Sequence, residues 1–110
     1  MMASSIDFVL DIISQLPQDL SFSHKKMFGE YGIFYSGKMI AMICDNQFFL
    51  KATEGGRALL PDCALQAPYP GAKAAILISE FANHDLLRQA IAATYRELPF
   101  PKSKTSTKLK

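Results

Sequence analysis

The sequence predicts an α+β fold in which an antiparallel sheet of four to five strands carries helices mainly on one face. Three consecutive apolar stretches have the two-residue period of strands, and dipeptides suited to tight turns separate them. Stretches with helical character precede this group, follow it and close the chain, which gives the order α-βββ-α-(β)-β-α. At 110 residues, the chain is expected to form one main domain.

The N-terminal segment is typical of an amphipathic helix. Ser4 and Ser5 can cap its first turn, and Pro17 ends it. The following apolar positions have helical spacing and define its predicted buried stripe: Ile6, Val9, Leu10, Ile13 and Leu16. Residues 17–26 are rich in polar and turn-forming side chains, so we expect them to form a connection without regular structure.

A meander of three antiparallel strands is predicted over residues 27–35, 38–44 and 47–52. The dipeptides Ser36-Gly37 and Asp45-Asn46 lie between these strands and favour two-residue hairpin turns. Both turns follow directly on apolar stretches, which is the pattern expected of consecutive hairpins.

Two glycines interrupt the first strand of this meander. Gly29 and Gly32 each lie in a row of large side chains, where a glycine permits a bulge or the close approach of a ring or helix. Close packing is the expected reason for both, and the alternative is a ligand that lies against the bare backbone.

The second half of the chain alternates between helix and strand. Thr53 can cap a short helix over residues 54–62, which two glycines weaken. Residues 63–73 are predicted to form a loop with a brief strand at Leu65–Ala67, and residues 74–81 a further strand. Asn83 can cap a last helix before Pro99. One stripe of that helix is apolar: Leu87, Ile91, Tyr95 and Leu98.

The net charge of +2 is unevenly placed along the chain. Four of the twelve basic residues, and none of the ten acidic ones, lie in residues 101–110, so residues 1–100 carry a net charge of −2. We therefore expect a folded domain over residues 1–100 and a basic tail over 101–110 that is too polar to order alone. An acidic body argues against sequence-specific DNA binding by the domain. Nonspecific phosphate contacts remain open to the tail lysines: Lys102, Lys104, Lys108 and Lys110.

The composition limits the cellular compartment in which we expect the protein and the cofactors that it could bind. Cys44 and Cys63 are expected to be reduced thiols, and no apolar run approaches the length of a membrane span, so we expect a cytoplasmic protein. His24 and His84 lie far apart without cysteine or histidine at ligand spacing, and neither a metal nor another cofactor is expected.

One candidate binding site surrounds the predicted start of the short helix. Free backbone N–H groups, the helix dipole and two cations there could hold an anion. Its predicted residues are Lys51, Thr53, Gly55, Gly56 and Arg57, with Tyr69 and Lys73 as an extension. The alternative is that Lys51 and Arg57 pair with surface acids such as Glu54 or Asp62.

A catalytic reading finds little support. His84 lies near Glu80 and Asp85, but a histidine at a helix start flanked by acids is usually solvated or part of a cap, and no nucleophile stands nearby. Cys44 lies in an apolar strand and is expected to be a buried, inert thiol. We predict no catalytic residues and no enzyme activity.

Both faces of the predicted meander are apolar, which favours self-association. Simple alternation sets Ile40, Met42 and Cys44 against Met39, Ala41 and Ile43. Three helices, one of them short, leave apolar area on such a sheet, and uncovered area of this kind usually marks an interface. We therefore expect a homodimer formed partly through the meander.

The stretches "MFGEYGIFYSGKMIAMICDNQFFLKATEGGRALL", "APYPGAKAAILISEF" and "ELPFPK" resemble the N-terminal domain of the TfoX/Sxy family of competence regulators, over residues 24–102. The motif positions are Met27, Phe28, Gly29, Gly32, Gly37, Leu50 and Lys51. Glu30 departs from the glycine that many relatives carry there. The resemblance implies an αβββαββα-like arrangement similar to secretion chaperones, many of them dimeric, and it offers no established catalytic residues.

Longer family members help to switch on natural-transformation genes together with a cyclic-AMP-dependent activator, and they carry a second, helical C-terminal domain where this sequence has a basic tail. The resemblance thus implies a non-enzymatic regulatory or protein-interaction domain, with a transcription-regulatory protein as an expected partner. Two alternatives are a small-ligand or anion-binding module at the Lys51–Arg57 corner and a weak nonspecific nucleic-acid binder acting through the tail.

Overall fold

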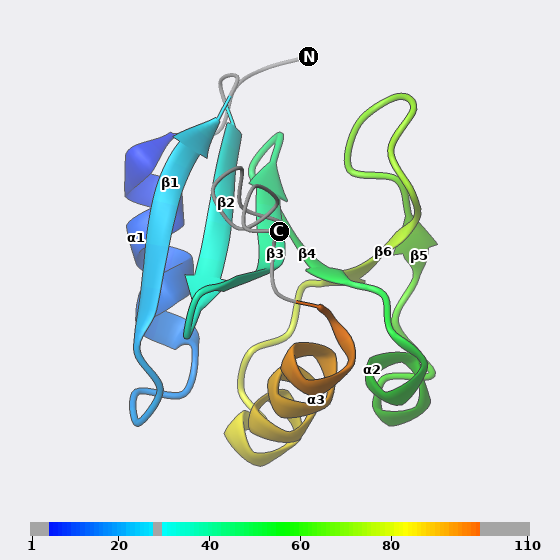
Figure 1. Cartoon of the computed structure of the whole chain (residues 1–110). Coiled ribbons are helices and arrows are strands. Elements are labelled where there is room, and N and C mark those ends of the chain that lie inside the picture. Colours follow the sequence, from blue (N-terminus) through cyan, green and yellow to red (C-terminus); the bar gives the residue numbers. More distant parts are fainter. Residues whose placement is uncertain (1–4, 28–29, 100–110) are drawn as a thin grey trace, which may run out of the picture.

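The computed structural model describes residues 5–27 and 30–99. In these ranges the chain forms three helices and one six-stranded antiparallel sheet with the strand order β1-β2-β3-β4-β6-β5 (Figure 1). The helices are α1 (Ile6–Gln15), α2 (Glu54–Leu59) and α3 (His84–Glu97). The strands are β1 (Phe22–Met27), β2 (Glu30–Tyr35), β3 (Lys38–Cys44), β4 (Gln47–Lys51), β5 (Leu65–Gln66) and β6 (Ala75–Ile78). The predicted α+β class is confirmed, with more strands than predicted.

The helices pack on one face of the sheet. Buried side chains of α1 and α3 share a core with β2, β3, β4 and β6, and α2 lies against α3 (Figure 1). We call the opposite side of the sheet the open face. Its central row runs across four paired strands and consists of Gly32, Met42, Phe49 and Leu77.

Capping groups begin all three helices at the predicted residues. The side-chain oxygens of Ser5, Thr53 and Asn83 accept hydrogen bonds from backbone N–H groups in the first turns of α1, α2 and α3. The predicted stripe of α1 is partly wrong, because Ile6 and Leu10 are 41% and 50% exposed. The side chains of α1 that are buried in the core are Val9 and Ile12, and the C-cap residue Leu16 is buried with them.

Both predicted hairpin turns are present. Ser36 and Gly37 have φ values of 47° and 87°, and Asp45 and Asn46 have φ values of 53° and 56°. Positive φ at both central residues matches the right-handed twist of the flanking strands. The order β2-β3-β4 of the meander is thereby set by local turn chemistry.

The connection predicted over residues 17–26 is wrong at its C-terminal end, where β1 pairs with β2 as an edge strand. Four of its six residues are exposed, so its sequence lacks the alternation of a half-buried strand. Phe22 holds it to the sheet by packing against Tyr35, with ring centroids 5.6 Å apart. Exposed lysines on such an edge discourage pairing with another sheet.

A bulge interrupts the pairing of β2 and β3 next to Gly32. Ile33 pairs with Ala41 and Phe34 with Met39, so Ile40 is an extra residue without a partner opposite. The predicted simple alternation of the second strand is therefore wrong. Met39 and Met42 both reach the open face, whereas Ile40 joins the core under the helices.

The close-packing interpretation of Gly32 is confirmed. A Cβ at Gly32 would lie 2.6 Å from Met39 Sδ, 3.2 Å from Met27 Sδ and 3.3 Å from Phe34 Cε1. The missing side chain lets these three groups cover the backbone. The same prediction for Gly29, together with the motif residue Phe28 and the tail 101–110, lies outside the described residues.

Candidate functional site

Two backbone N–H groups at the start of α2, those of Gly55 and Gly56, are already bound within the chain. The Gly56 N–H donates to the Thr53 hydroxyl oxygen at 3.0 Å, and the Gly55 N–H donates to both carboxylate oxygens of Glu97, at 2.9 and 3.2 Å. Glu97 comes from the last turn of α3 and occupies the position predicted for an external anion. This part of the predicted anion site is therefore satisfied by the fold itself.

Close contact with α3 explains the two glycines of α2. A Cβ at Gly55 would lie 3.1 Å from the Ala93 Cβ, and one at Gly56 would lie 2.9 Å from the Thr94 hydroxyl oxygen. Thr94 is fully buried. The glycines thus allow the two helices to approach each other, which is a structural role.

Three other residues of the predicted site line a cavity of about 840 Å³ on the open face. Of the seven predicted residues, Lys51, Tyr69 and Lys73 line this cavity, whereas Thr53, Gly55, Gly56 and Arg57 do not. The exposed Arg57 belongs to α2. Among the described residues, no ion pair joins Lys51 or Arg57 to Glu54 or Asp62.

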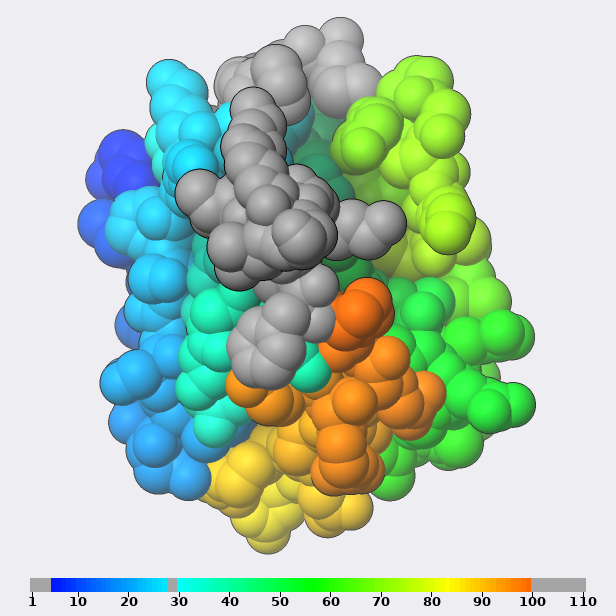
Figure 2. Space-filling view, viewed as in Figure 1, coloured from blue at the N-terminus to red at the C-terminus, as the bar shows by residue number. Residues whose placement is uncertain are grey.

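The cavity lies between the curved sheet and the loop over residues 67–74. Figure 2 shows this loop in light green on one side, β1 in blue on the other, and the end of α3 in orange between them. The cavity lining is mainly apolar and contains three methionines from β1 and β3. Its apolar groups include Met27, Met39, Met42, Phe49, Pro68 and Leu98.

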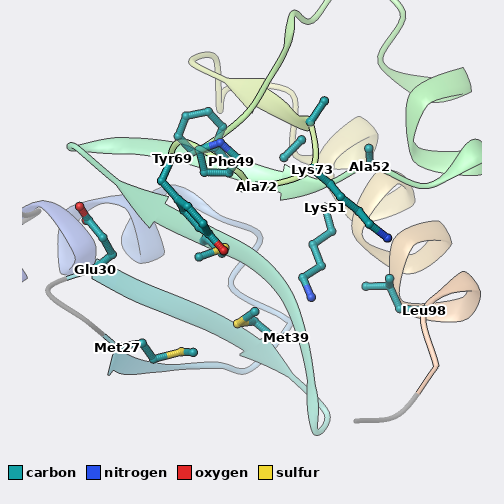
Figure 3. A pocket seen from close by; sticks show the side chains of 14 residues that line it. Met27, Glu30, Met39, Phe49, Lys51, Ala52, Tyr69, Ala72, Lys73 and Leu98 are labelled. Atoms are coloured by element: carbon teal, nitrogen blue, oxygen red, sulfur yellow. The ribbon is translucent and has the colours of Figure 1, made fainter. Parts of the chain in front are cut away.

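Two cations project into this apolar surrounding from neighbouring segments, since Lys51 pairs with Ala75, two residues after Lys73. Lys51 comes from the end of β4 and Lys73 from the loop, and both lie on the side of the cavity near Leu98 (Figure 3). Burial lowers the pKa of Lys51, and the positive charge of Lys73 lowers it further. An anion between the two ammonium groups would offset the repulsion between the two positive charges. It would also offset part of the cost of burying the Lys51 charge.

The opposite end of the cavity carries a negative charge. Glu30 lies there, away from the two lysines (Figure 3). Its carboxylate accepts a hydrogen bond from the Asp45 N–H at 3.3 Å, in the turn between β3 and β4. The cavity is therefore electrostatically polarised, with cations at one end and a carboxylate at the other.

The acid–base candidates near the start of α3 have structural partners. His84 Nε2–H donates to the Gln15 carbonyl oxygen at 2.9 Å, which joins the start of α3 to the end of α1. Asp85 forms an ion pair with Arg88 at 2.8 Å, and Arg88 also pairs with Asp19 at 2.9 Å. Glu80 is exposed beside them.

The thiols are not activated. Burial raises the pKa of Cys44 to about 11, with smaller contributions from Glu30 and Asp45. Burial also raises the pKa of Cys63, and both cysteines are free. A thiol with a raised pKa is mostly protonated at neutral pH and is a poor nucleophile. Within the described ranges, no group of three histidine, cysteine or acidic side chains could hold a metal ion.

Sequence reasoning missed the cavity, because its walls come from distant segments. One available signal was the spacing of Met27, Met39 and Met42, since flexible thioethers often line adaptable binding surfaces. It also missed the buried Lys38, whose ammonium donates to the Tyr95 carbonyl oxygen at 2.6 Å and lies 4.1 Å from the Tyr95 ring centroid.

The family comparison agrees with this architecture. The family model described as TfoX N-terminal domain matches residues 15–98. The chain belongs to the TfoX N-terminal domain family. Several of its motif residues now have places: Met27 and Lys51 line the cavity, Gly32 lies under Met39, Gly37 forms a turn, and Leu50 is buried.

A curated relative matches nearly the whole chain. The "Uncharacterized 12.7 kDa protein in trpE 5'region" of Spirochaeta aurantia is 33% identical over 114 residues, which cover 96% of each chain. In the described part of this TfoX-type domain, no helix combines the length and apolar character that a membrane crossing requires.

Proposed function

We propose that this TfoX-type domain is a non-enzymatic regulatory module that works by binding, and that the cavity on its open face is the binding surface. The observation that carries the proposal is a mainly apolar cavity of about 840 Å³ into which Lys51 and Lys73 project. Such a combination of apolar lining and a few convergent polar groups is characteristic of ligand sites.

The geometry around the other reactive side chains supports binding over catalysis. His84 joins α3 to the end of α1, Asp85 pairs with Arg88 within α3, and the pKa of both thiols is raised. These groups are committed to structure or kept protonated, so they offer no activated acid, base or nucleophile beside the cavity.

The regulatory role is proposed from the family, whose longer members act on natural-transformation genes with a partner activator. In this chain the body carries a net charge of −2, so we propose action through a protein partner in the cytoplasm and no sequence-specific DNA contact by the body. We also propose a homodimer, formed through the part of the open face beyond the cavity.

A complementation experiment in the native host tests this function. Deleting the gene should change the transcripts of DNA-uptake genes, and the wild-type gene should restore them. Lys73→Glu should fail to restore them, because it reverses a charge at the cavity. Arg57→Glu is the matched control, since Arg57 is a cation outside the cavity, and it should complement fully.

Two outcomes would contradict the proposal. One is a deletion strain whose transcripts are unchanged. The other is equal complementation by Lys73→Glu and Arg57→Glu, which would remove the cavity from the function. Protein levels of both variants, measured in the same cells, show whether a failure to complement reflects lost binding or lost protein.

A further inference from the structure

We propose that the cavity on the open face binds a small amphiphile with one carboxylate head and an extended apolar body, with the head placed between Lys51 and Lys73. This inference rests on the proposed function, in which the open face is the binding surface. It names the chemical class of the ligand.

The head group follows from charge complementarity. Within the described residues, neither Lys51 nor Lys73 forms an ion pair, although both line one cavity from neighbouring segments. A carboxylate has two acceptor oxygens and can receive one N–H from each ammonium group. Because burial and Lys73 lower the pKa of Lys51, a bound anion would offset an unfavourable arrangement that is already present in the fold.

The opposite end of the cavity limits the ligand to a single charge. Glu30 would repel a second anionic group placed there. A dicarboxylate that spans the cavity therefore fits poorly, whereas a molecule with one charged end fits in one orientation. The distribution of charge in the cavity thus determines the orientation of the ligand as well as the negative charge of its head group.

The apolar body of the ligand is inferred from the residues that line the cavity between these two ends. Met27, Met39, Met42 and Phe49 form the apolar wall on the sheet, and Leu98 closes the side near the lysines. A volume of about 840 Å³ lies within the usual range of small-molecule sites, roughly 300–1,000 Å³. Methionine side chains adapt to irregular shapes, which suits a flexible alkyl chain.

The chain's own C-terminal segment is a poor occupant. The segment after Pro99 begins beside Leu98, a residue of the cavity wall, so it is within reach. Its four lysines and lack of acidic residues would place further cations beside Lys51 and Lys73. Charge therefore favours an anionic ligand over this segment.

The test uses calorimetric titration of the full chain with three probes at neutral pH. Decanoate combines the head and the body, butyrate has the head with a short body, and decyltrimethylammonium has the body with the opposite charge. Butyrate should bind at least about 30-fold more weakly than decanoate, because it lacks six methylene groups. Decyltrimethylammonium should show no measurable binding.

Matched variants locate the head. The double substitution Lys51→Gln and Lys73→Gln should weaken decanoate binding by at least about 10-fold, since both charge-assisted hydrogen bonds are lost. Arg57→Gln should leave the affinity within about twofold, as expected for an exposed cation outside the cavity. Lys73→Gln alone changes only an exposed loop residue, so it tests the head group without risk to the fold.

The affinity should depend on pH in both directions. Decanoate must be ionised, so binding weakens as pH falls toward about 4–5. Lys51 must be protonated, and the ligand raises the pKa that burial lowers in the free protein. Binding therefore weakens again as pH rises through the pKa of Lys51 in the free protein.

Methyl-labelled methionine gives the position of the body by NMR. Decanoate should shift the methyl signals of Met39 and Met42, which line the cavity. Equal binding of decanoate and decyltrimethylammonium, equal losses in the lysine and Arg57 variants, or no decanoate binding would overturn the inference. If decanoate fails while Lys73→Glu still fails to complement in the host, the proposed function stands and the ligand class is wrong.

Discussion

Gly32 is a residue whose missing side chain lets two methionines lie close against the open face of the sheet. The sulfur atoms of Met39 and Met27 lie over its backbone, at 2.6 and 3.2 Å from the position of an added Cβ. Both methionines also line the cavity. A side chain at this position would displace them, so the residue couples the packing of the sheet to the shape of the cavity.

Substitution of Gly32 tests this coupling. Gly32→Val should lower the free energy of unfolding by about 1–3 kcal/mol through overpacking, measured as a shift of the denaturant midpoint. Ser23→Val, on the exposed edge strand β1, should change it by less than about 0.5 kcal/mol. An unchanged midpoint for Gly32→Val would show that the methionines do not rest on this backbone in solution.

At the same scale, only some residue roles were accessible from the sequence. Ser5, Thr53 and Asn83 were predicted as caps because a cap is a local pattern. Lys38 was not singled out, since its partner Tyr95 lies 57 residues away. Glu97 was likewise unnoticed, because its contact with Gly55 depends on how α2 and α3 meet.

The contact between α2 and α3 is the clearest case of one element completing another. A six-residue helix cannot satisfy its own N-terminal N–H groups, and here Glu97 from α3 accepts from one of them. The interhelical carboxylate therefore acts as a second cap beside Thr53.

Removing that carboxylate should weaken the pair of helices. Glu97→Ala should lower the free energy of unfolding by about 1 kcal/mol, the usual effect of losing a helix cap. Glu80→Ala is the control, because Glu80 is an exposed carboxylate outside the helices, and it should have little effect. Equal midpoints for both variants in chemical denaturation would contradict a capping role for Glu97.

The strands whose pairing is specified by local turns were predicted correctly. The strand whose pairing depends on tertiary contacts was missed. The dipeptides Ser36-Gly37 and Asp45-Asn46 identified β2, β3 and β4 together with their order. Strand β1 has four exposed residues in a row and lacks the alternation of a half-buried strand, so its sequence resembled a connection. The bulge at Ile40 could not be predicted from the sequence either, because an extra residue is recognised only when the pairing with the neighbouring strand is known.

For the whole molecule, the open face decides the expected oligomeric state. The loop over residues 67–74 covers one part of this face and forms a cavity wall, while Phe34 lies outside the cavity and remains half-buried. Polar β1 and the very short β5 are the edges of the sheet, so self-association through a face is favoured over pairing of edges.

Light scattering over a range of concentrations should therefore give twice the chain mass of 12.2 kDa at micromolar concentration. Phe34→Glu should shift the mass to that of the monomer, because it places a charge in the proposed interface. Leu10→Glu changes an exposed apolar residue of α1 on the helical side and should leave the dimer intact. A wild-type chain that stays at 12.2 kDa at high concentration would disprove the dimer.

The cavity walls also have a consequence for the life of the protein in the cell. They reach from Met27 to Leu98, nearly the full described chain, so a nascent polypeptide cannot form the cavity until the last helix has been synthesised. A ligand of this cavity cannot guide early folding and binds only the finished domain. Binding that is restricted to the folded state lowers the unfolded fraction by mass action. Since cellular proteases act on unfolded chains, the abundance of the protein would rise with the concentration of its ligand.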